Sequence, residues 1–294
     1  MNKVGFIGVG IMGKSMVRNL MKAGFELHIY ARTKGKVEDV IGEGAQFHES
    51  IKDCVQDCDA VITIVGFPQD VEEVYFDQGN ILDSAKEGAY LIDMTTTSPQ
   101  IAEKIYAEGT KRGFHVMDAP VTGGDTGAKA GTLSILVGGE KEDYEACMPL
   151  FEAMGTNINY QGKAGCGQHC KLANQIMIAG TLSGVCEALT YAKEQGLDPE
   201  VFMKSVATGA AGSKQLDTFG PKILKDDYAP GFFMKHFIKD MKLALIEANR
   251  KGLSLDVLSM VLANYEELEQ EGYGDLGTQA LMKFYDEEHR NTEE

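Results

Sequence analysis

The first half of the chain alternates short apolar runs with longer segments of helical spacing. Continuous apolar runs bounded by turn residues are typical of buried parallel strands, and the segments between them repeat apolar residues every three to four positions. This alternation predicts an α/β fold, a doubly wound sheet of the Rossmann type. The predicted strands are 4–8, 26–31, 60–65, 90–94, 115–118, 133–138 and 158–161, and the predicted helices are 12–23, 71–77 and 99–112.

The pattern changes after residue 167, where only helical spacing remains. One long helix over 171–195 is rich in Ala, Leu, Ile and Met and includes the small residues Gly180, Ser183 and Gly184. We therefore expect a dinucleotide-binding domain over 1–163 and an all-α substrate and dimerisation domain over 164–294, its long helix starting at about residue 168. Further helices are predicted at 199–208, 237–251, 255–270 and 278–287, and the charged tail 286–294 is expected to fray.

Composition narrows the classes of partner. Apolar residues make up 44% of the 294 residues, and the formal net charge is −16. Nucleic-acid binding draws on Lys and Arg, so this acidity predicts no nucleic-acid partner. No apolar run is expected to reach a membrane span of ~18 to 20 residues, and no signal peptide is expected. The six cysteines lack C-x-x-C spacing, which favours reduced thiols and a cytoplasmic location.

A glycine motif directly follows the first predicted strand and opens the first predicted helix. Gly8, Gly10 and Gly13 have the G-x-G-x-x-G spacing, with Ile11 and Met12 in its second half. In such motifs the first glycine permits a tight turn, the second lets backbone approach a pyrophosphate, and the third lets helix pack on strand. The free amides of the helix then face the phosphates. We expect all five residues to contact a dinucleotide.

The residues after the second predicted strand indicate which dinucleotide is bound. An NAD-preferring site has Asp or Glu there to bind the ribose hydroxyls, whereas this chain has Arg32 and Thr33, with Lys36 close by. A guanidinium can bind a 2′-phosphate through paired charge-assisted bonds. The sequence thus favours NADP, with NAD as the alternative if Arg32 is only a solvated loop cation.

Four blocks together resemble the β-hydroxyacid dehydrogenase family, which includes 3-hydroxyisobutyrate dehydrogenases, tartronate semialdehyde reductases and succinic or glyoxylic semialdehyde reductases. They are GFIGVGIMG at 5–13, DAPVTGG at 118–124 with GTL at 131–133, GCGQHCKLAN at 165–174 and KDM at 239–241. The blocks occur in the order of the family and cover nearly the whole chain. The resemblance implies an NAD(P)-dependent oxidoreductase.

By this resemblance, Thr122, Gly123 and Gly124 bind the carboxylate of the substrate. Consecutive amides next to glycines can curl around an anion, and the Thr122 hydroxyl adds a donor where the family more often has Ser. A glycine-rich surface turn is the plain alternative, because residues 123–131 contain four glycines.

The resemblance makes Lys171 the acid/base residue. Its ammonium would donate a proton to the carbonyl oxygen as hydride arrives, and burial is expected to lower its pKa. Asn174 and Gln175 share its helix face, and Asn174 is expected to assist catalysis while Gln175 contacts substrate. Because some relatives have Asn at the position of Gln175, which amide holds the substrate stays open. A solvated helix lysine is the alternative.

Other positions match the family less fully. Lys239 resembles its cofactor-contacting lysine, and Thr96 matches a position near the nicotinamide ribose. Val65 and Gly66 stand at the cofactor edge, where the family usually has Leu-Pro. His169 is near these residues and is expected to be structural. No metal site is expected, since no H-E-x-x-H motif or carboxylate cluster occurs.

These features together predict NADPH-linked reduction of a short semialdehyde or 2-oxoacid, or the reverse reaction, on a small carboxylate-bearing substrate. NAD-linked oxidation of 3-hydroxyisobutyrate is the close alternative. An imine reductase is disfavoured by Lys171, and a decarboxylating sugar-phosphate dehydrogenase by the short helical half. A non-catalytic NAD(P)-binding module is expected to have lost Lys171 and the anion loop. The resemblance also implies a homodimer or homotetramer built on the long helix. Cys166 and Cys170 lie just before Lys171 and have no assigned redox role.

Overall fold

The structure is a computed structural model that describes residues 1–285 of the chain. Two compact units divide between Lys171 and Leu172. Among the described residues, the first unit contains every named strand, and the second is built from helices. Each unit is described by itself.

The first unit is built on a nine-stranded sheet in the order β3-β2-β1-β4-β5-β6-β8-β7, with β9 paired to β8. The strands from β3 to β6 are parallel, whereas β8 runs antiparallel to β6 and β7. The order reverses at β1, next to β4, and ligands of doubly wound sheets bind at such a point. The strands are β1 (Lys3–Ile7), β2 (Glu26–Tyr30), β3 (Gln46–Phe47), β4 (Ala60–Thr63), β5 (Tyr90–Asp93), β6 (His115–Asp118), β7 (Val121–Thr122), β8 (Leu133–Gly138) and β9 (Gly155–Gly162).

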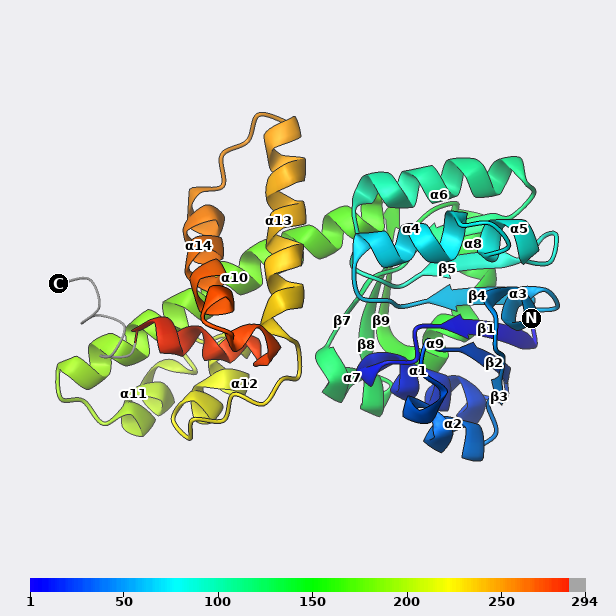
Figure 1. Cartoon of the computed structure of the whole chain (residues 1–294). Coiled ribbons are helices and arrows are strands. Elements are labelled where there is room, and N and C mark those ends of the chain that lie inside the picture. The colour runs from blue at the N-terminus through cyan, green and yellow to red at the C-terminus, as the bar shows by residue number, and fades with distance from the viewer. Residues whose placement is uncertain (286–294) are drawn as a thin grey trace. The chain divides into compact units, whose positions relative to one another are not determined.

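Helices cover both faces of this sheet (Figure 1). Several begin with recognisable caps: Ser98 accepts a hydrogen bond from the amide of Gln100, and proline follows at the first helical position. The helical segments are α1 (Ile11–Lys22), η1 (Lys34–Lys36), α2 (Glu38–Gly42), α3 (Ile51–Val55), α4 (Pro68–Phe76), α5 (Ile81–Ser84), α6 (Pro99–Lys111), α7 (Gly124–Ala130), α8 (Lys141–Ala146) and α9 (Met148–Met154).

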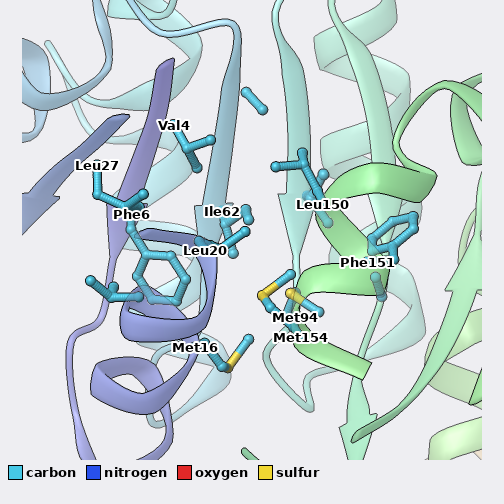
Figure 2. Packing of buried hydrophobic residues seen from close by; sticks show 14 of the residues in the cluster. Val4, Phe6, Met16, Leu20, Leu27, Ile62, Met94, Leu150, Phe151 and Met154 are labelled. Atoms are coloured by element: carbon cyan, nitrogen blue, oxygen red, sulfur yellow. The ribbon is translucent and has the colours of Figure 1, made fainter. Parts of the chain in front are cut away.

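The two faces of the sheet have separate apolar cores. One core packs α1 and α9 against the strands, and Figure 2 shows Phe6, Met16 and Leu20 on one side of it and Leu150 and Met154 on the other. The second core packs α3 to α6 on the opposite face. Because both faces are covered, the strands β1, β2, β4, β5 and β6 are mostly buried and rich in apolar residues, which is why their positions could be predicted.

The second unit is all helical within the described residues, apart from one isolated bridge between Phe233 and Gly277. The long helix α10 runs through its apolar core, and α13 and α14 pack against each other. The final predicted helix is a 3-10 helix, and the predicted tail lies outside the described residues. The elements are α10 (Cys166–Glu194), α11 (Pro199–Val206), α12 (Lys214–Ile223), α13 (Met234–Arg250), α14 (Asp256–Gln270), η2 (Tyr273–Asp275) and η3 (Thr278–Tyr285).

Helix α10 is long and apolar enough, by length and composition alone, to cross a membrane. The sequence pattern did not indicate this, because Lys171 and Glu187 interrupt the apolar run. In the structure its buried side, including Leu182, Cys186 and Leu189, belongs to the core of the helical unit. A core helix in a large apolar cluster has the same composition as a membrane helix.

Candidate active site

The glycine turn after β1 has the geometry that a dinucleotide requires. Gly8 has a φ of +96°, and a Cβ there would lie 2.1 Å from the carbonyl oxygen of Ile64. A Cβ on Gly13 would lie 2.2 Å from the carbonyl oxygen of Gly8, so α1 packs tightly on the turn. A Cβ on Gly10 would meet no described residue within 4 Å. The first and third glycines are therefore required by packing, and the second leaves space through which a ligand can approach backbone.

The start of α1 is suited to an anion. Among residues 1–285, no side chain caps its N-terminus, and its first turn contains no acidic residue. Gly10 and Ile11 are exposed and Met12 is half-buried. Free amides and the positive end of the helix dipole stabilise negative charge at such a position. These residues fit the pyrophosphate of a dinucleotide.

The ends of β4 and β5 are joined by side-chain hydrogen bonds at the same edge of the sheet. The Thr95 hydroxyl accepts a bond from the amide of Val65 at 3.0 Å. Asp93 Oδ1 accepts bonds from the Thr63 hydroxyl at 2.8 Å and the Thr95 amide at 3.1 Å. Asp93 and Thr95 thus hold two loops together. These loops contain the residues that the sequence assigns to the cofactor, Val65, Gly66 and Thr96.

Asp93 is an unusual carboxyl group. It is 2% exposed, and burial raises its pKa to about 6 because the charged form loses its hydration. Asp118, at the end of the neighbouring strand, contributes repulsion that acts in the same direction. Sequence reasoning did not assign Asp93 a part in this site.

Asp118 fixes the start of α10 to the end of β6. Its two carboxylate oxygens accept bonds from the amides of Gly165 and Gln168, both at 2.8 Å. These amides lie at the N-terminal end of the helix, where donors have no intrahelical partner. A carboxylate that accepts them holds the helix start and is stabilised by it.

Gln168 joins the same helix to the loop after β5. Its Nε2 donates to the carbonyl of Thr95 at 2.7 Å, and its Oε1 accepts from the amide of Thr97 at 3.0 Å. Lys171 follows Gln168 by three residues, so both lie on one face of α10. Lys171 is 7% exposed. The predicted acid/base lysine is therefore buried one helical turn after an anchor to the loop that contains Thr96.

Close backbone approach brings this helix start against the sheet. A Cβ on Gly167 would lie 2.3 Å from the carbonyl oxygen of Leu136, and one on Gly138 would lie 2.5 Å from Asp118 Oδ1. Real Cβ contacts are longer than this, so both positions require glycine. The G-C-G block at 165–167 is thus a packing motif as well as part of the resemblance.

The predicted carboxylate loop follows the short strand β7. Thr122 pairs with Ser134 of β8, and the chain then passes through Gly123 and Gly124, with φ values of +128° and +64°, into α7. No side chain in the described part of the chain caps α7. Asp125, in its first turn, pairs with Lys129 at 3.0 Å. Successive positive φ values let neighbouring amides turn toward one side, which is compatible with a small anion site.

Arg32 is engaged by two carboxylates of α4. Its guanidinium donates to Asp70, and its distance to Glu73 Oε2 is 3.3 Å. The Asp70 bond raises the pKa of Arg32. Thr33 is exposed and precedes η1, in which Lys34 lies 3.4 Å from Glu49. Arg32 and Lys34 of the predicted phosphate-binding loop are thus paired with acids from other segments of the first unit, which the local sequence did not reveal.

The helical unit joins four polar residues in one chain of contacts. Asn174 Nδ2 donates to Gln175 Oε1 at 2.9 Å, and Gln175 Nε2 donates to Asp240 Oδ2 at 2.7 Å. Lys239 Nζ lies 3.0 Å from Asp240 Oδ1. Asp240 is fully buried and connects Gln175 with Lys239. The sequence assigned Asn174, Gln175 and Lys239 to the site, and the contacts show how Asp240 connects Gln175 with Lys239.

His169 is exposed on α10. Among the described residues, no group of three or more His, Cys, Asp or Glu side chains is placed to hold a metal ion. All six cysteines are free. The groups at this edge of the sheet are backbone amides, hydroxyls, the Gln168 amide, the carboxyl groups of Asp93 and Asp118, and the Lys171 ammonium.

Comparison with known proteins covers nearly the whole described chain. Residues 3–162 match the NAD binding domain of 6-phosphogluconate dehydrogenase, and residues 165–285 match the NAD-binding family of NADP-dependent 3-hydroxyisobutyrate dehydrogenase.

Curated relatives are similar over nearly their full length. They include the uncharacterized oxidoreductase YkwC of Bacillus subtilis, 49% identical over 96% of this chain and 98% of that protein. The probable mitochondrial 3-hydroxyisobutyrate dehydrogenase-like 1 of Arabidopsis thaliana is 44% identical over 95% of this chain and 84% of its own length. The NAD-dependent L-serine dehydrogenase of Pseudomonas aeruginosa is 34% identical over 97% and 98%.

Among solved structures, the Mycobacterium tuberculosis 3-hydroxyisobutyrate dehydrogenase with L-serine matches with a TM-score of 0.88 and 26% identity, over 96% of this chain and 98% of that one. The similarity therefore includes both units and all four sequence blocks.

Proposed function

Because this chain belongs to the β-hydroxyacid dehydrogenase family and is an NAD(P)-dependent enzyme of the 3-hydroxyisobutyrate dehydrogenase type, we propose that it reduces a short semialdehyde or 2-oxoacid with NADPH, or catalyses the reverse oxidation, with Lys171 as acid/base. One observation supports this most directly: Lys171 is buried one turn after an anchored helix start, in the unit that contains the glycine turn.

The proposed mechanism divides the work among residues of this chain. NADPH, when bound, supplies the hydride. The Lys171 ammonium donates a proton to the carbonyl oxygen that becomes the hydroxyl, and the neutral amine accepts that proton in the reverse direction. The amides of Gly123 and Gly124, with the Thr122 hydroxyl, bind the substrate carboxylate and orient it.

We propose that Asn174, rather than Gln175, is the amide that contacts the substrate. Both ends of the Gln175 amide already have partners, and Gln175 is 2% exposed. Asn174 is half-buried and uses its Nδ2 for the bond to Gln175. Gln175 and Asp240 would then position Asn174, and Lys239 would contact the cofactor.

The first experiment replaces Lys171 with Ala. We expect kcat to fall by about 10²- to 10⁴-fold, because proton transfer loses its acid, while the Kd for the dinucleotide changes little. Lys193→Ala removes an exposed lysine from the same helix and serves as the matched control. Activity assays on both variants measure kcat, titrations with the dinucleotide measure its Kd, and circular dichroism confirms that both variants are folded. A folded Lys171→Ala variant with the parental kcat would refute the assignment.

Substrate and cofactor choice need a second experiment. Two- to five-carbon semialdehydes and 2-oxoacids are assayed with NADPH and with NADH at equal concentrations, and 3-hydroxyisobutyrate and L-serine are assayed in the oxidative direction. Arg32 and the NADP-dependent family match support NADPH. The NAD-dependent L-serine dehydrogenase among the relatives supports the alternative of NAD-linked oxidation. A higher kcat/KM with NADH for every substrate would replace our proposal with that alternative.

We also propose that the enzyme is a cytoplasmic homodimer that forms through its helical unit. Met177, Gly184 and Tyr191 lie seven residues apart along α10, and the two large side chains are 74% and 67% exposed. Val257 and Met260 of α14 are also exposed, and Val257 lies next to Gly180 of α10. A second copy of the chain would cover this apolar stripe.

A further inference from the structure

The ion pairs of Arg32 carry an inference about the cofactor. Arg32 extends from the end of β2, and both of its acidic partners lie on α4, 38 and 41 residues further along the chain. The Arg32 side chain is 61% exposed, Asp70 18% and Glu73 53%. All three belong to the first unit. The ion pairs of Arg32 thus join two segments of that unit, the one that follows β2 and the one that follows β4.

Asp70 is held in place by a second role. Its Oδ2 accepts a bond from the amide of Phe67 at 2.9 Å, which caps the first turn of α4, and its Oδ1 receives the guanidinium. Glu73 lies one turn further along, and its contact with Arg32 is longer. The acid that binds Arg32 more closely is therefore also the one that the backbone fixes.

Charge balance determines what this arrangement does to a phosphate. A phosphate monoester carries about −1.5 to −2 charges at neutral pH. At this loop it would meet one guanidinium already shared between two carboxylates, and Lys34 nearby is paired with Glu49. Both acids contact Nη2 of Arg32, so a phosphate can reach the other guanidinium donors, but it would then lie close to two carboxylates that share the positive charge of Arg32 and repel the phosphate. A ribose 2′-hydroxyl carries no charge, and a carboxylate can accept its hydrogen bond.

We propose that Asp70 and Glu73 are specificity-determining residues: they compete with the 2′-phosphate for Arg32 and so reduce the preference for NADP over NAD that Arg32 alone would give. This inference rests on the proposed function, since it concerns the same cofactor site. It predicts that Arg32 is an incomplete indicator of NADP use in this chain, because the acids of α4 oppose it.

The test measures the Kd of NADP⁺ and of NAD⁺ by titration calorimetry, without substrate or turnover. The variants are Glu73→Gln, Asp70→Asn and the double variant. Each amide keeps the shape of the acid, and the side-chain oxygen of the Asp70→Asn variant can still accept the bond from the Phe67 amide. We expect each single variant to tighten NADP⁺ about two- to fivefold, the range of exposed ion pairs, and to leave NAD⁺ within about twofold.

Glu72 offers a matched control. It lies on the same helix between the two acids and pairs with Lys104 at 3.0 Å rather than with Arg32. Glu72→Gln changes the net charge of the protein by the same amount, so we expect the ratio of the two Kd values to stay unchanged. Equal tightening in Glu72→Gln would mean that only the overall field matters, and it would overturn the proposal.

An Arg32→Ala background supplies the second check. If the acids act through Arg32, Glu73→Gln tightens NADP⁺ less in that background than in the parent. If the variant that combines Asp70→Asn and Glu73→Gln keeps the parental ratio of the Kd values of NADP⁺ and NAD⁺, the inference is also overturned. These outcomes are separate from the proposed function: a parent enzyme that binds NAD⁺ more tightly would refute NADPH use, while the shift in the variants would still support competition.

Discussion

At the scale of single residues, the sequence identified side chains by type but could not identify their partners. Arg32 was recognised as a candidate phosphate ligand, yet Asp70 and Glu73 lie far along the chain and only folding brings them to it. Gly8, Gly10 and Gly13 were predictable, because their roles depend on local backbone geometry. Asp93 was not, since its properties come from burial between neighbouring strands.

Asp93 gives a prediction about pH. Its folded-state pKa of about 6 lies above the ordinary value of 3.8, so the unfolded chain ionises first as the pH rises. Stability is therefore lost between about pH 4 and pH 6. Asp93→Asn removes this loss, because an amide does not ionise in this pH range. Its oxygen can accept the bonds from Thr63 and Thr95, and its nitrogen replaces Oδ2, which has no hydrogen-bond partner among the described residues.

Urea unfolding of both proteins at pH 4 and pH 7.5 measures the effect. The free energy of unfolding of Asp93→Asn, relative to the parent, is expected to rise by about 2 to 3 kcal/mol between the two values. Other carboxyl groups titrate in both proteins and largely cancel in this difference. A difference that does not change with pH would show that Asp93 is not a titrating buried acid.

At the scale of elements, burial on both faces decided what could be predicted. The strands from β1 to β8 that are four or more residues long were predicted to within two residues at each end. The strands β3 and β7 were missed, because two residues are too few to show a pattern. The long helix was expected to start at Lys171 or at about residue 168, whereas it starts at Cys166. Its earlier start depends on Asp118, which is some fifty residues away in sequence.

The attachment of α10 can be tested through Gln168. In Gln168→Ala, the carbonyl of Thr95 and the amide of Thr97 lose their partner inside the protein, and both residues are at most 1% exposed. An unsatisfied buried group costs about 1 to 3 kcal/mol, so with two such groups we expect the free energy of unfolding to fall by about 2 to 6 kcal/mol. His169→Ala, one residue later and exposed, is expected to change it by less than about 0.5 kcal/mol. Equal losses in the two variants would argue against a bridging role for Gln168.

At the scale of the whole molecule, the two-part organisation followed from the change of pattern near residue 167. What the pattern could not show is which apolar residues stay exposed, because helical spacing does not distinguish a core face from an interface. The structure identifies Met177 and Tyr191 of α10 as exposed apolar side chains on one stripe of that helix. That stripe leads to a prediction about assembly.

Light scattering coupled to size-exclusion chromatography tests the assembly. For a chain of 32.0 kDa, we expect a parental mass of about 64 kDa, twice that of the chain, at micromolar concentration. Met177→Glu places a charge within the proposed interface and is expected to shift the mass toward one chain. Leu253→Glu, at an exposed apolar residue between α13 and α14, is the control and is expected to keep the parental mass. Monomeric parent protein, or equal dissociation in both variants, would contradict the proposed interface.

The division between the compact units falls immediately after Lys171, within a continuous helix. The proposed proton donor therefore belongs to the same body as the dinucleotide turn, while Asn174, Gln175 and Lys239 belong to the other. The proposed carboxylate loop at Thr122 also lies in the first body, so both bodies supply residues proposed for the substrate, and Lys239 is proposed for the cofactor. A change of hydroxyacid can therefore arise from substitutions in either half of the chain.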